Sequence, residues 1–198
     1  MRVEALQLGA LGTNCYIVQN EHGAFVIDPA CDAETILGAA QKMGVTLDAV
    51  VLTHGHYDHI AAADDLGVDV VHLHESEEKY YQKPEYNLSG HFGASFYGKT
   101  EAKLLHDGDV FMGFTVIHTP GHTPGGICLY NKEENTLFSG DTLFCRGYGR
   151  TDFPGGSMMK LRESLLKLLA LPEDTKVYPG HGSSTTIAQE RRNLGWRP

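Results

Sequence analysis

The chain has 198 residues, a length that suits one globular domain with a sizeable core. Hydrophobic residues make up 41% and charged residues 21%, which excludes a disordered or fibrous chain. A formal net charge of −9 argues against nucleic-acid binding, because an acidic surface repels phosphate backbones.

The chain shows no membrane or export signal. No apolar run approaches the ~20 residues that span a bilayer, and the N-terminus lacks the uninterrupted apolar stretch of a signal peptide. Its four cysteines are scattered and form no CxxC pair, which agrees with reduced thiols. We therefore expect a cytoplasmic protein without a membrane partner.

Strands and helices are predicted in alternation. In the first half, periodicity and turn residues predict strands at 15–18, 24–27, 48–52 and 68–73 and helices at 33–43, 60–66 and 75–82. Residues 83–99 show no clear period and are predicted to form a long ordered loop, a usual place for substrate contacts. The second half predicts an amphipathic helix at 157–169 and strands at 109–111, 114–117, 126–130, 136–139 and 177–178. This order predicts two sheets with helices outside, an α/β sandwich, in a single domain over residues 1–198.

The most informative motif is Thr53-His54-Gly55-His56-Tyr57-Asp58-His59, directly after a predicted buried strand. Imidazole nitrogen and carboxylate oxygen are ligands of zinc and iron. In a loop, His54 and His56 can converge on one point, while Asp58 and His59 can face a second. A solvated polar turn is the plainer alternative.

Three later residues repeat the pattern of a polar side chain after an apolar strand and beside glycine or proline. They are His122 in Thr119-Pro120-Gly121-His122, Asp141 in Ser139-Gly140-Asp141, and His181 in Pro179-Gly180-His181. Together with the first motif they make seven ligands, enough for two metals that share one carboxylate. The remaining coordination positions would admit water and substrate, as a catalytic site requires.

The ordered set HxHxDH, GH, SGD and PGH resembles the metallo-β-lactamase superfamily, from about Ile27 to Thr186. The resemblance implies a four-layer αββα sandwich with the site at one edge of its two sheets. It also implies that His54, His56 and His122 hold a first metal, that Asp58, His59 and His181 hold a second, and that Asp141 bridges them. By the same resemblance Asp28, in VIDPA, orients ligands from behind.

Within the superfamily, the stretches Gly140–Phe144 and Gly147-Tyr148-Gly149-Arg150 resemble glyoxalase II. That resemblance implies hydrolysis of thioesters such as S-lactoylglutathione, with Arg150 and Tyr148 in substrate binding. A guanidinium fork suits the carboxylate of glutathione, although a salt bridge with Asp152 is an equal alternative. No separate C-terminal helical domain is expected, so the chain resembles a short single-domain branch.

The expected reaction uses two divalent ions, zinc first with iron or manganese as alternatives. A shared water would lose a proton near pH ~7 and give a metal-bridging hydroxide as nucleophile. Asp58 is the candidate catalytic residue, because it can ligate the second metal and orient or accept the proton of the nucleophile.

Rival functions remain. A mononuclear-iron persulfide dioxygenase of the same superfamily would keep the same motif letters, and a non-enzymatic metal-binding module is a remoter alternative. A β-lactamase is disfavoured by the missing signal peptide. Gly93–Thr100 matches the P-loop pattern, but no apolar strand precedes it and no helix is predicted after Lys99 and Thr100, so nucleotide binding is disfavoured.

Overall fold

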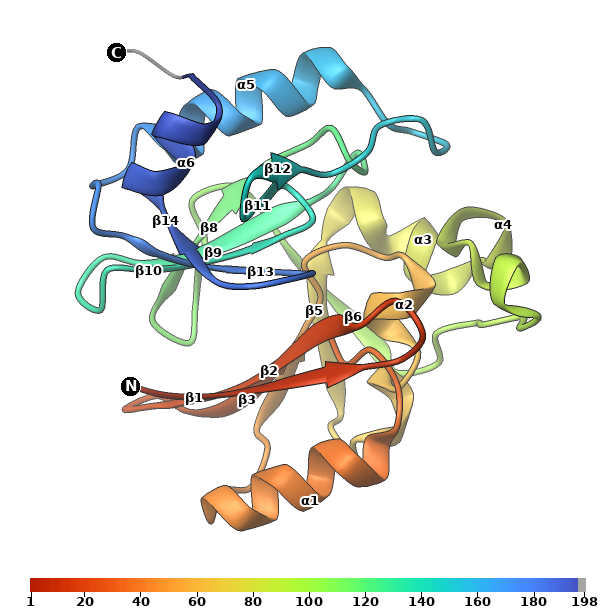
Figure 1. The fold of residues 1–198 in the computed structure, drawn as a ribbon. Helices are drawn as coiled ribbons and strands as arrows, with labels where there is room; N and C mark the ends of the chain where they lie inside the picture. Colours follow the sequence, from red (N-terminus) through yellow and green to blue (C-terminus); the bar gives the residue numbers. More distant parts are fainter. Residues whose placement is uncertain (196–198) are drawn as a thin grey trace. The chain divides into compact units, whose positions relative to one another are not determined.

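The computed structural model describes residues 1–195 (Figure 1). The chain divides into two compact units, Met1–Leu105 and His106–Pro198. Each unit contains one six-stranded sheet, and the second also has a separate two-stranded ribbon.

The sheet of the first unit has the strand order β1-β2-β3-β4-β5-β6. Its first three strands pair antiparallel and the last four pair parallel. The carboxyl ends of parallel strands open at one edge of a sheet, which is where α/β proteins place ligand sites. Asp28 follows β3 and His54 lies close after β4 at that edge, since Ile27 pairs with Val51. The strands are β1 (Arg2–Leu8), β2 (Thr13–Asn20), β3 (Gly23–Ile27), β4 (Ala49–Val51), β5 (Val70–His74) and β6 (Glu101–Leu105).

Helix α1 (Ala33–Met43) packs its buried residues Ile36 and Ala40 into the core of this unit. Asp32 caps it by accepting from the Thr35 N–H, and Gly44 ends it at a φ of 74°. The other helical segments are short, and several of them surround the histidine motif. They are α2 (Tyr57–Ile60), η1 (Ala63–Asp65), η2 (Glu75–Glu77), α3 (Glu78–Gln82), α4 (Pro84–Asn87) and η3 (Ser89–Phe92).

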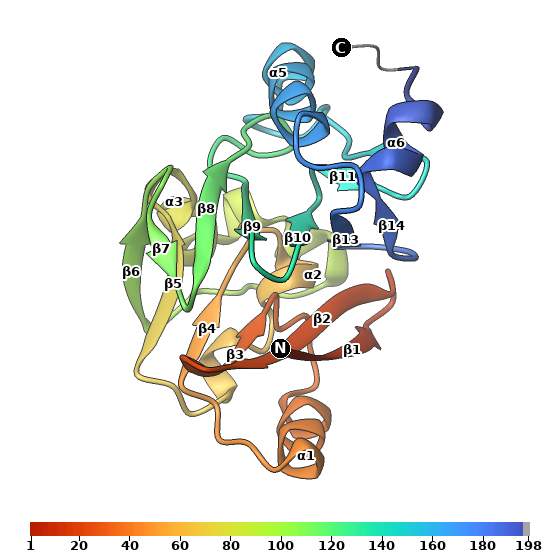
Figure 2. The same cartoon turned by 90° about the vertical axis from the view of Figure 1, so that its left-hand side faces the viewer.

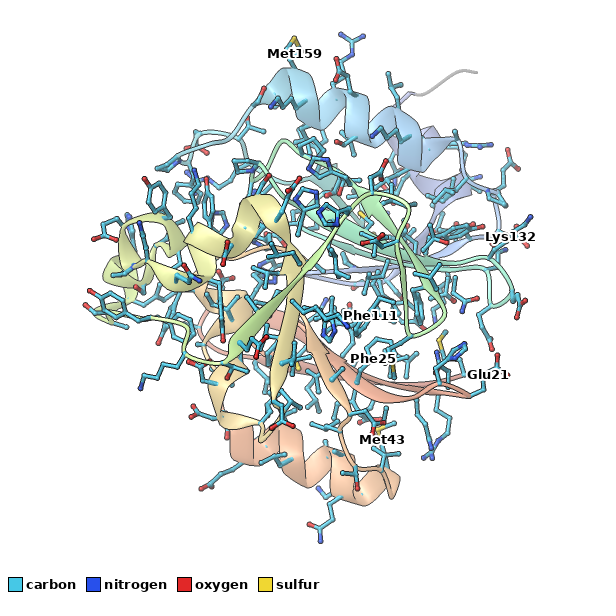
Figure 3. The ribbon with its side chains drawn as sticks, turned by 180° about the vertical axis from the view of Figure 1, so that it is seen from behind. Glu21, Phe25, Met43, Phe111, Lys132 and Met159 are labelled. Atoms are coloured by element: carbon cyan, nitrogen blue, oxygen red, sulfur yellow. The ribbon has the colours of Figure 1, made fainter. Side chains whose placement is uncertain are left out.

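The sheet of the second unit has the order β14-β13-β10-β9-β8-β7, and only β10 and β13 pair parallel. Helix α5 (Met158–Leu169) packs against this sheet through Leu161, Leu165 and Leu168, while Met159 points outward (Figures 2 and 3). The remaining elements are β7 (Val110–Phe111), β8 (Phe114–His118), β9 (Ile127–Asn131), β10 (Thr136–Gly140), β11 (Leu143–Phe144), β12 (Gly147–Tyr148), β13 (Lys176–Pro179), β14 (Thr185–Thr186) and α6 (Ile187–Asn193).

Most predicted elements lie where the sequence placed them, with differences at the edges. The predicted loop at 83–99 contains the helical turns α4 and η3, and the predicted helix at 60–66 is instead the short pair α2 and η1. Strands β1, β6, β11, β12 and β14 and helix α6 had no predicted counterpart.

Candidate metal centre

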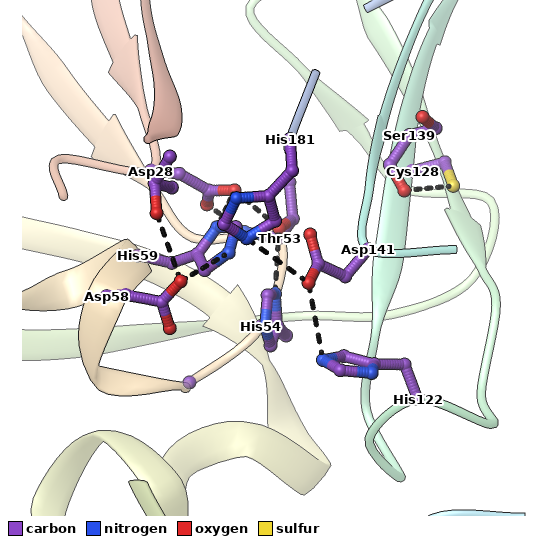
Figure 4. A network of polar contacts seen from close by, with 12 residues as sticks. Asp28, Thr53, His54, Asp58, His59, His122, Cys128, Ser139, Asp141 and His181 are labelled. Carbon is purple, nitrogen blue, oxygen red and sulfur yellow. Dashed lines mark hydrogen bonds and ion pairs between the residues drawn. The ribbon is translucent and has the colours of Figure 1, made fainter. Parts of the chain in front are cut away.

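In the first unit, a buried carboxylate organises the histidine motif. Asp28 accepts hydrogen bonds from the Thr53 N–H at 2.7 Å and the Thr53 hydroxyl at 2.6 Å, and its Oδ2 lies 2.9 Å from His59 Nδ1 (Figure 4). Asp28 is 1% exposed and has a left-handed φ of 51°, a conformation uncommon for a non-glycine residue. Asp28, directly after β3, therefore holds both the first residue of the motif, Thr53, and the last, His59.

These contacts set the tautomers of two histidines. A carboxylate only accepts, so a neutral His59 carries its proton on Nδ1. The Thr53 hydroxyl donates to Asp28, so its oxygen accepts from Nδ1 of His54 at 3.1 Å. In both rings Nε2 then keeps a lone pair, the arrangement of metal-ligating histidines whose other nitrogen is hydrogen-bonded.

Asp58 brings a carboxylate to the same turn. Its Oδ2 lies 3.5 Å from His59 Nε2 and accepts a hydrogen bond of 3.0 Å from the Thr13 hydroxyl. Two ligands about 2.1 Å from one tetrahedral zinc ion lie roughly 3.4 Å apart. Asp58 and His59 thus have the separation of two ligands on one ion, and Thr13 holds the carboxylate in place from β2.

Glu77 supports the turn between His54 and His56. It is 0% exposed, and its Oε2 accepts from the Gly55 N–H at 2.8 Å. A Cβ on Gly55 would lie 2.4 Å from Tyr80 Cβ, so only glycine fits. Burial, followed by the nearby Glu77 charge, raises the pKa of Tyr80 to about 12. The rings of His54 and His56 lie 4.8 Å apart above this support.

In the second unit, Asp141 lies close to two histidines. Its Oδ2 is 3.5 Å from His122 Nε2 and 3.6 Å from His181 Nε2, contacts drawn as dashed lines in Figure 4. These separations also match two ligands on one ion. His122 Nδ1 lies 2.7 Å from the Arg150 carbonyl oxygen, an acceptor only, so a neutral His122 keeps a lone pair on Nε2. One carboxylate oxygen of Asp141 therefore lies at a ligand-like separation from two histidine nitrogens.

Close backbone packing holds these three side chains. A Cβ on Gly149 would lie 1.9 Å from the Asp141 carbonyl oxygen, so the segment after β12 requires glycine there. The Gly180 N–H donates to the Gly140 carbonyl at 2.8 Å, which joins the His181 turn to the Asp141 turn. Behind Asp141, the Cys128 thiol donates to the Ser139 carbonyl, and burial raises its pKa to about 12.

Arg150 and Tyr148 lie beside these residues. The Arg150 side chain is 57% exposed and forms two hydrogen bonds of 2.6 and 2.5 Å with Asp152, and its guanidinium lies 4.0 Å from the centre of the Phe153 ring. The bonds from Arg150 lower the pKa of Asp152 to about 2. Tyr148 is 45% exposed on β12. The salt bridge weighed from sequence is present, and it pre-orients the Arg150 fork.

Each unit gathers its own predicted ligands. His54, His56, Asp58 and His59 lie together in the first unit, and His122, Asp141 and His181 in the second. Sequence reasoning missed Thr13 and Glu77, which meet the motif only through tertiary contacts 45 and 22 residues away. Thr53 belongs to the motif, but the sequence does not indicate that it links Asp28 to His54.

The P-loop-like stretch binds an internal carboxylate. The N–H groups of Lys99 and Thr100 donate to Asp64 at 2.9 and 3.0 Å, and the Tyr81 hydroxyl donates to the same side chain. Burial would raise the pKa of Asp64, but these hydrogen bonds lower it overall. Strand β6 follows, so no helix begins there to bind a phosphate.

A family model described as "Metallo-beta-lactamase superfamily" matches residues 8–181. The chain belongs to this superfamily and has its fold, as its motifs predicted. This places it among the superfamily's metal-dependent hydrolases, with clusters of His and Asp suited to divalent ions.

Two curated bacterial proteins are similar over nearly their whole length. "Hydroxyacylglutathione hydrolase GloC" of Haemophilus influenzae is 35% identical, over 98% of this chain and 96% of that protein. "Probable metallo-hydrolase YqgX" of Bacillus subtilis is 34% identical, over 96% of this chain and 95% of that protein.

Three solved structures share the fold. TTHA1623 in a di-iron-bound form has a TM-score of 0.91 and 36% identity, over 96% of this chain and 98% of that chain. BLEG-1 B3 metallo-β-lactamase has a TM-score of 0.90 and 37% identity, over 96% of this chain and 97% of that chain. ETHE1 from Myxococcus xanthus has a TM-score of 0.78 and 30% identity, over 98% of this chain and 83% of that chain. No helix within residues 1–195 is long and apolar enough to cross a membrane.

Proposed function

We propose that this chain hydrolyses thioesters of the S-lactoylglutathione class with two divalent metal ions. The observation that carries the proposal is the similarity to GloC over almost the whole of both chains. The resemblance of residues 140–150 to glyoxalase II, read from sequence, supports the same substrate class.

In this proposal the seven ligand residues form one dinuclear centre. His54, His56 and His122 would hold one ion, Asp58, His59 and His181 would hold the other, and Asp141 would be shared by both. Support comes from the ligand-like separations of 3.5 Å between Asp58 and His59 and of 3.5 and 3.6 Å between Asp141 and its two histidines. Zinc fits these ligands, and the di-iron form of TTHA1623 supports iron as the alternative.

The chemistry that two such ions would supply is polarisation of the thioester carbonyl and a lowering of the pKa of water to about 7. Asp58 orients the attacking water and accepts its proton, while Thr13 keeps the carboxylate aimed. Asp28 accepts a hydrogen bond from Nδ1 of His59 and so keeps Nε2 of that ring available to a metal ion. Arg150 and Tyr148 bind the thiol carrier, with the guanidinium facing a carboxylate. A thiol leaving group with a pKa near ~8.5 departs without a strong acid, which favours thioesters over amides.

The first test measures the metal content of the protein and its hydrolysis of S-lactoylglutathione. Protein purified anaerobically without added metal should contain two ions per chain, and it should hydrolyse S-lactoylglutathione. A mononuclear-iron persulfide dioxygenase is the second candidate, which the similarity to ETHE1 fits. One iron per chain with oxygen consumption on glutathione persulfide would favour it. Hydrolysis of a β-lactam alone would instead align the chain with BLEG-1.

Asp58→Ala tests the proposed catalytic residue. We expect kcat for S-lactoylglutathione to fall by roughly 10²–10⁴-fold, because a proton acceptor and a metal ligand are lost together. Metal analysis should show weaker binding of one ion. Asp65→Ala, an exposed carboxylate a few residues along the chain, is the matched control. Near-normal turnover with two bound ions in Asp58→Ala would contradict the assignment.

A further inference from the structure

An aromatic cluster formed by Tyr57, Phe92 and Phe96 joins the 83–99 segment to the ligand turn. Tyr57 stands in the chain between His56 and Asp58. Its ring centre lies 5.4 Å from that of Phe92 and 6.0 Å from that of Phe96. These are ordinary spacings for interacting aromatic pairs. The segment after α4 is therefore in direct contact with the turn that carries the candidate ligands.

The cluster is fixed at its inner end. The Phe96 N–H donates to the Ser89 hydroxyl at 3.1 Å, and the Asn87 amide donates to the Phe96 carbonyl at 3.0 Å. The Phe96 ring lies 5.9 Å from Tyr81, which is 1% exposed, and packs against the core of the first unit. An ordered backbone and a buried neighbour hold the position of the rings.

Its outer end is exposed. Phe92 keeps 41% of its surface open, and Tyr57 is half-buried. When a ligand covers an apolar ring that is open to solvent, the burial of that apolar surface contributes favourably to the free energy of binding. Because all three rings are uncharged, the matching part of a ligand is uncharged too.

We propose that Phe92 and Tyr57 contact the acyl group of the substrate and determine acyl-chain preference. This inference rests on the proposed thioester hydrolysis. The thiol carrier glutathione bears carboxylates, which require cations such as Arg150, whereas the acyl group next to the scissile carbonyl carries no charge. Because Tyr57 stands in the chain between two candidate ligands, these rings are assigned the acyl group, which is bonded to the reacting carbon, rather than the more distant carboxylates of the carrier.

The test compares acyl groups on one carrier: S-acetyl-, S-lactoyl- and S-mandeloylglutathione. In Phe92→Ala we expect kcat/KM to fall about 5–10-fold for the mandeloyl thioester, which loses an aromatic contact, and less than about 2-fold for the acetyl thioester. Phe92→Leu keeps apolar area without the ring, so its kcat/KM for the mandeloyl thioester should lie between the values of the wild-type chain and of Phe92→Ala. Tyr97→Ala removes a 56% exposed aromatic side chain from the same segment and should leave all three values unchanged.

Metal content is measured on every variant, so that an altered centre is not mistaken for lost substrate contact. An equal change for all three thioesters, or none, with both ions retained, would overturn the acyl-group assignment while thioester hydrolysis stands. If the wild-type chain hydrolyses none of the three, the proposed function fails and the acyl assignment falls with it.

Discussion

Arg150 is held in one orientation before any substrate arrives. Asp152 binds its Nε and Nη2, and Phe153 stacks on the guanidinium plane. A fork already oriented loses less conformational freedom when it binds an anion. Because the pair with Asp152 uses Nε and Nη2, a substrate carboxylate can approach Nη1 without breaking the pair.

We expect Arg150→Ala to raise KM for S-lactoylglutathione about 10-fold, with a smaller change in kcat, because the contact lies away from the reacting bond. The pKa of Asp152 is lowered to about 2, so the ion pair is present above that pH and is lost only as the pH falls through it. The effect on KM should therefore be equal at pH 6 and pH 8. A thioester of N-acetylcysteamine, which has no carboxylate, is the control and should show no change.

At the scale of elements, prediction from sequence succeeded where local signals agree. Helix α1 has its predicted bounds because Asp32, Gly44 and the apolar spacing all mark the same segment. The two-residue strands β11 and β12 were missed, and in the six-stranded sheets so were β1, β6 and β14, each of which is an edge of its sheet. An edge strand such as β1 alternates between half-buried and exposed residues, so it lacks the apolar run that identifies an inner strand.

The segments that carry the candidate ligands have a related local signal. Each segment follows an apolar strand, so that a local pattern coincides with a place where sheets present side chains. Thr13 and Glu77 support the same turn without any local signal, because they reach it across 45 and 22 residues. Their roles follow from tertiary folding alone.

Asp32 offers a test of how α1 begins. It has a φ of 58° and accepts from both the N–H and the hydroxyl of Thr35, bonds that lower its pKa. Asp32→Ala should reduce the free energy of unfolding by about 1–2 kcal/mol, since it removes the cap and leaves an alanine in a left-handed conformation. Asp32→Asn keeps an acceptor and tolerates that φ, so it should cost less than about 0.5 kcal/mol.

Urea denaturation at pH 7 measures both variants. The lowered pKa means that the charged cap stabilises the chain above the ordinary pKa of 3.8 and that this contribution disappears as the pH falls below it. The difference between the wild-type chain and Asp32→Ala should therefore narrow at pH 3. An alanine variant as stable as the asparagine variant at pH 7 would show that α1 does not depend on its cap.

At the scale of the whole molecule, the candidate ligands are divided between the two compact units, four in the first and three in the second. A centre that draws on both would couple metal binding to the stability of the entire chain. Ions that bind only the folded state stabilise it by about 2.7 kcal/mol at a hundred times Kd. For a chain of this size that corresponds to a rise in Tm of about 5–10 °C.

Thermal unfolding of the apo protein, with and without added Zn²⁺, measures this coupling directly. We expect the wild-type chain to show the full rise and Asp141→Asn to lose most of it, because the proposed bridging carboxylate serves both ions. Asp174→Asn, an exposed carboxylate in the same unit, should keep the full rise. If Asp141→Asn responds to zinc like the wild-type chain, Asp141 is not a shared ligand, and the ions depend on the histidines and on Asp58 alone. The same measurement is then repeated anaerobically with Fe²⁺. The metal that gives the larger rise in Tm at equal concentration binds the folded chain more tightly.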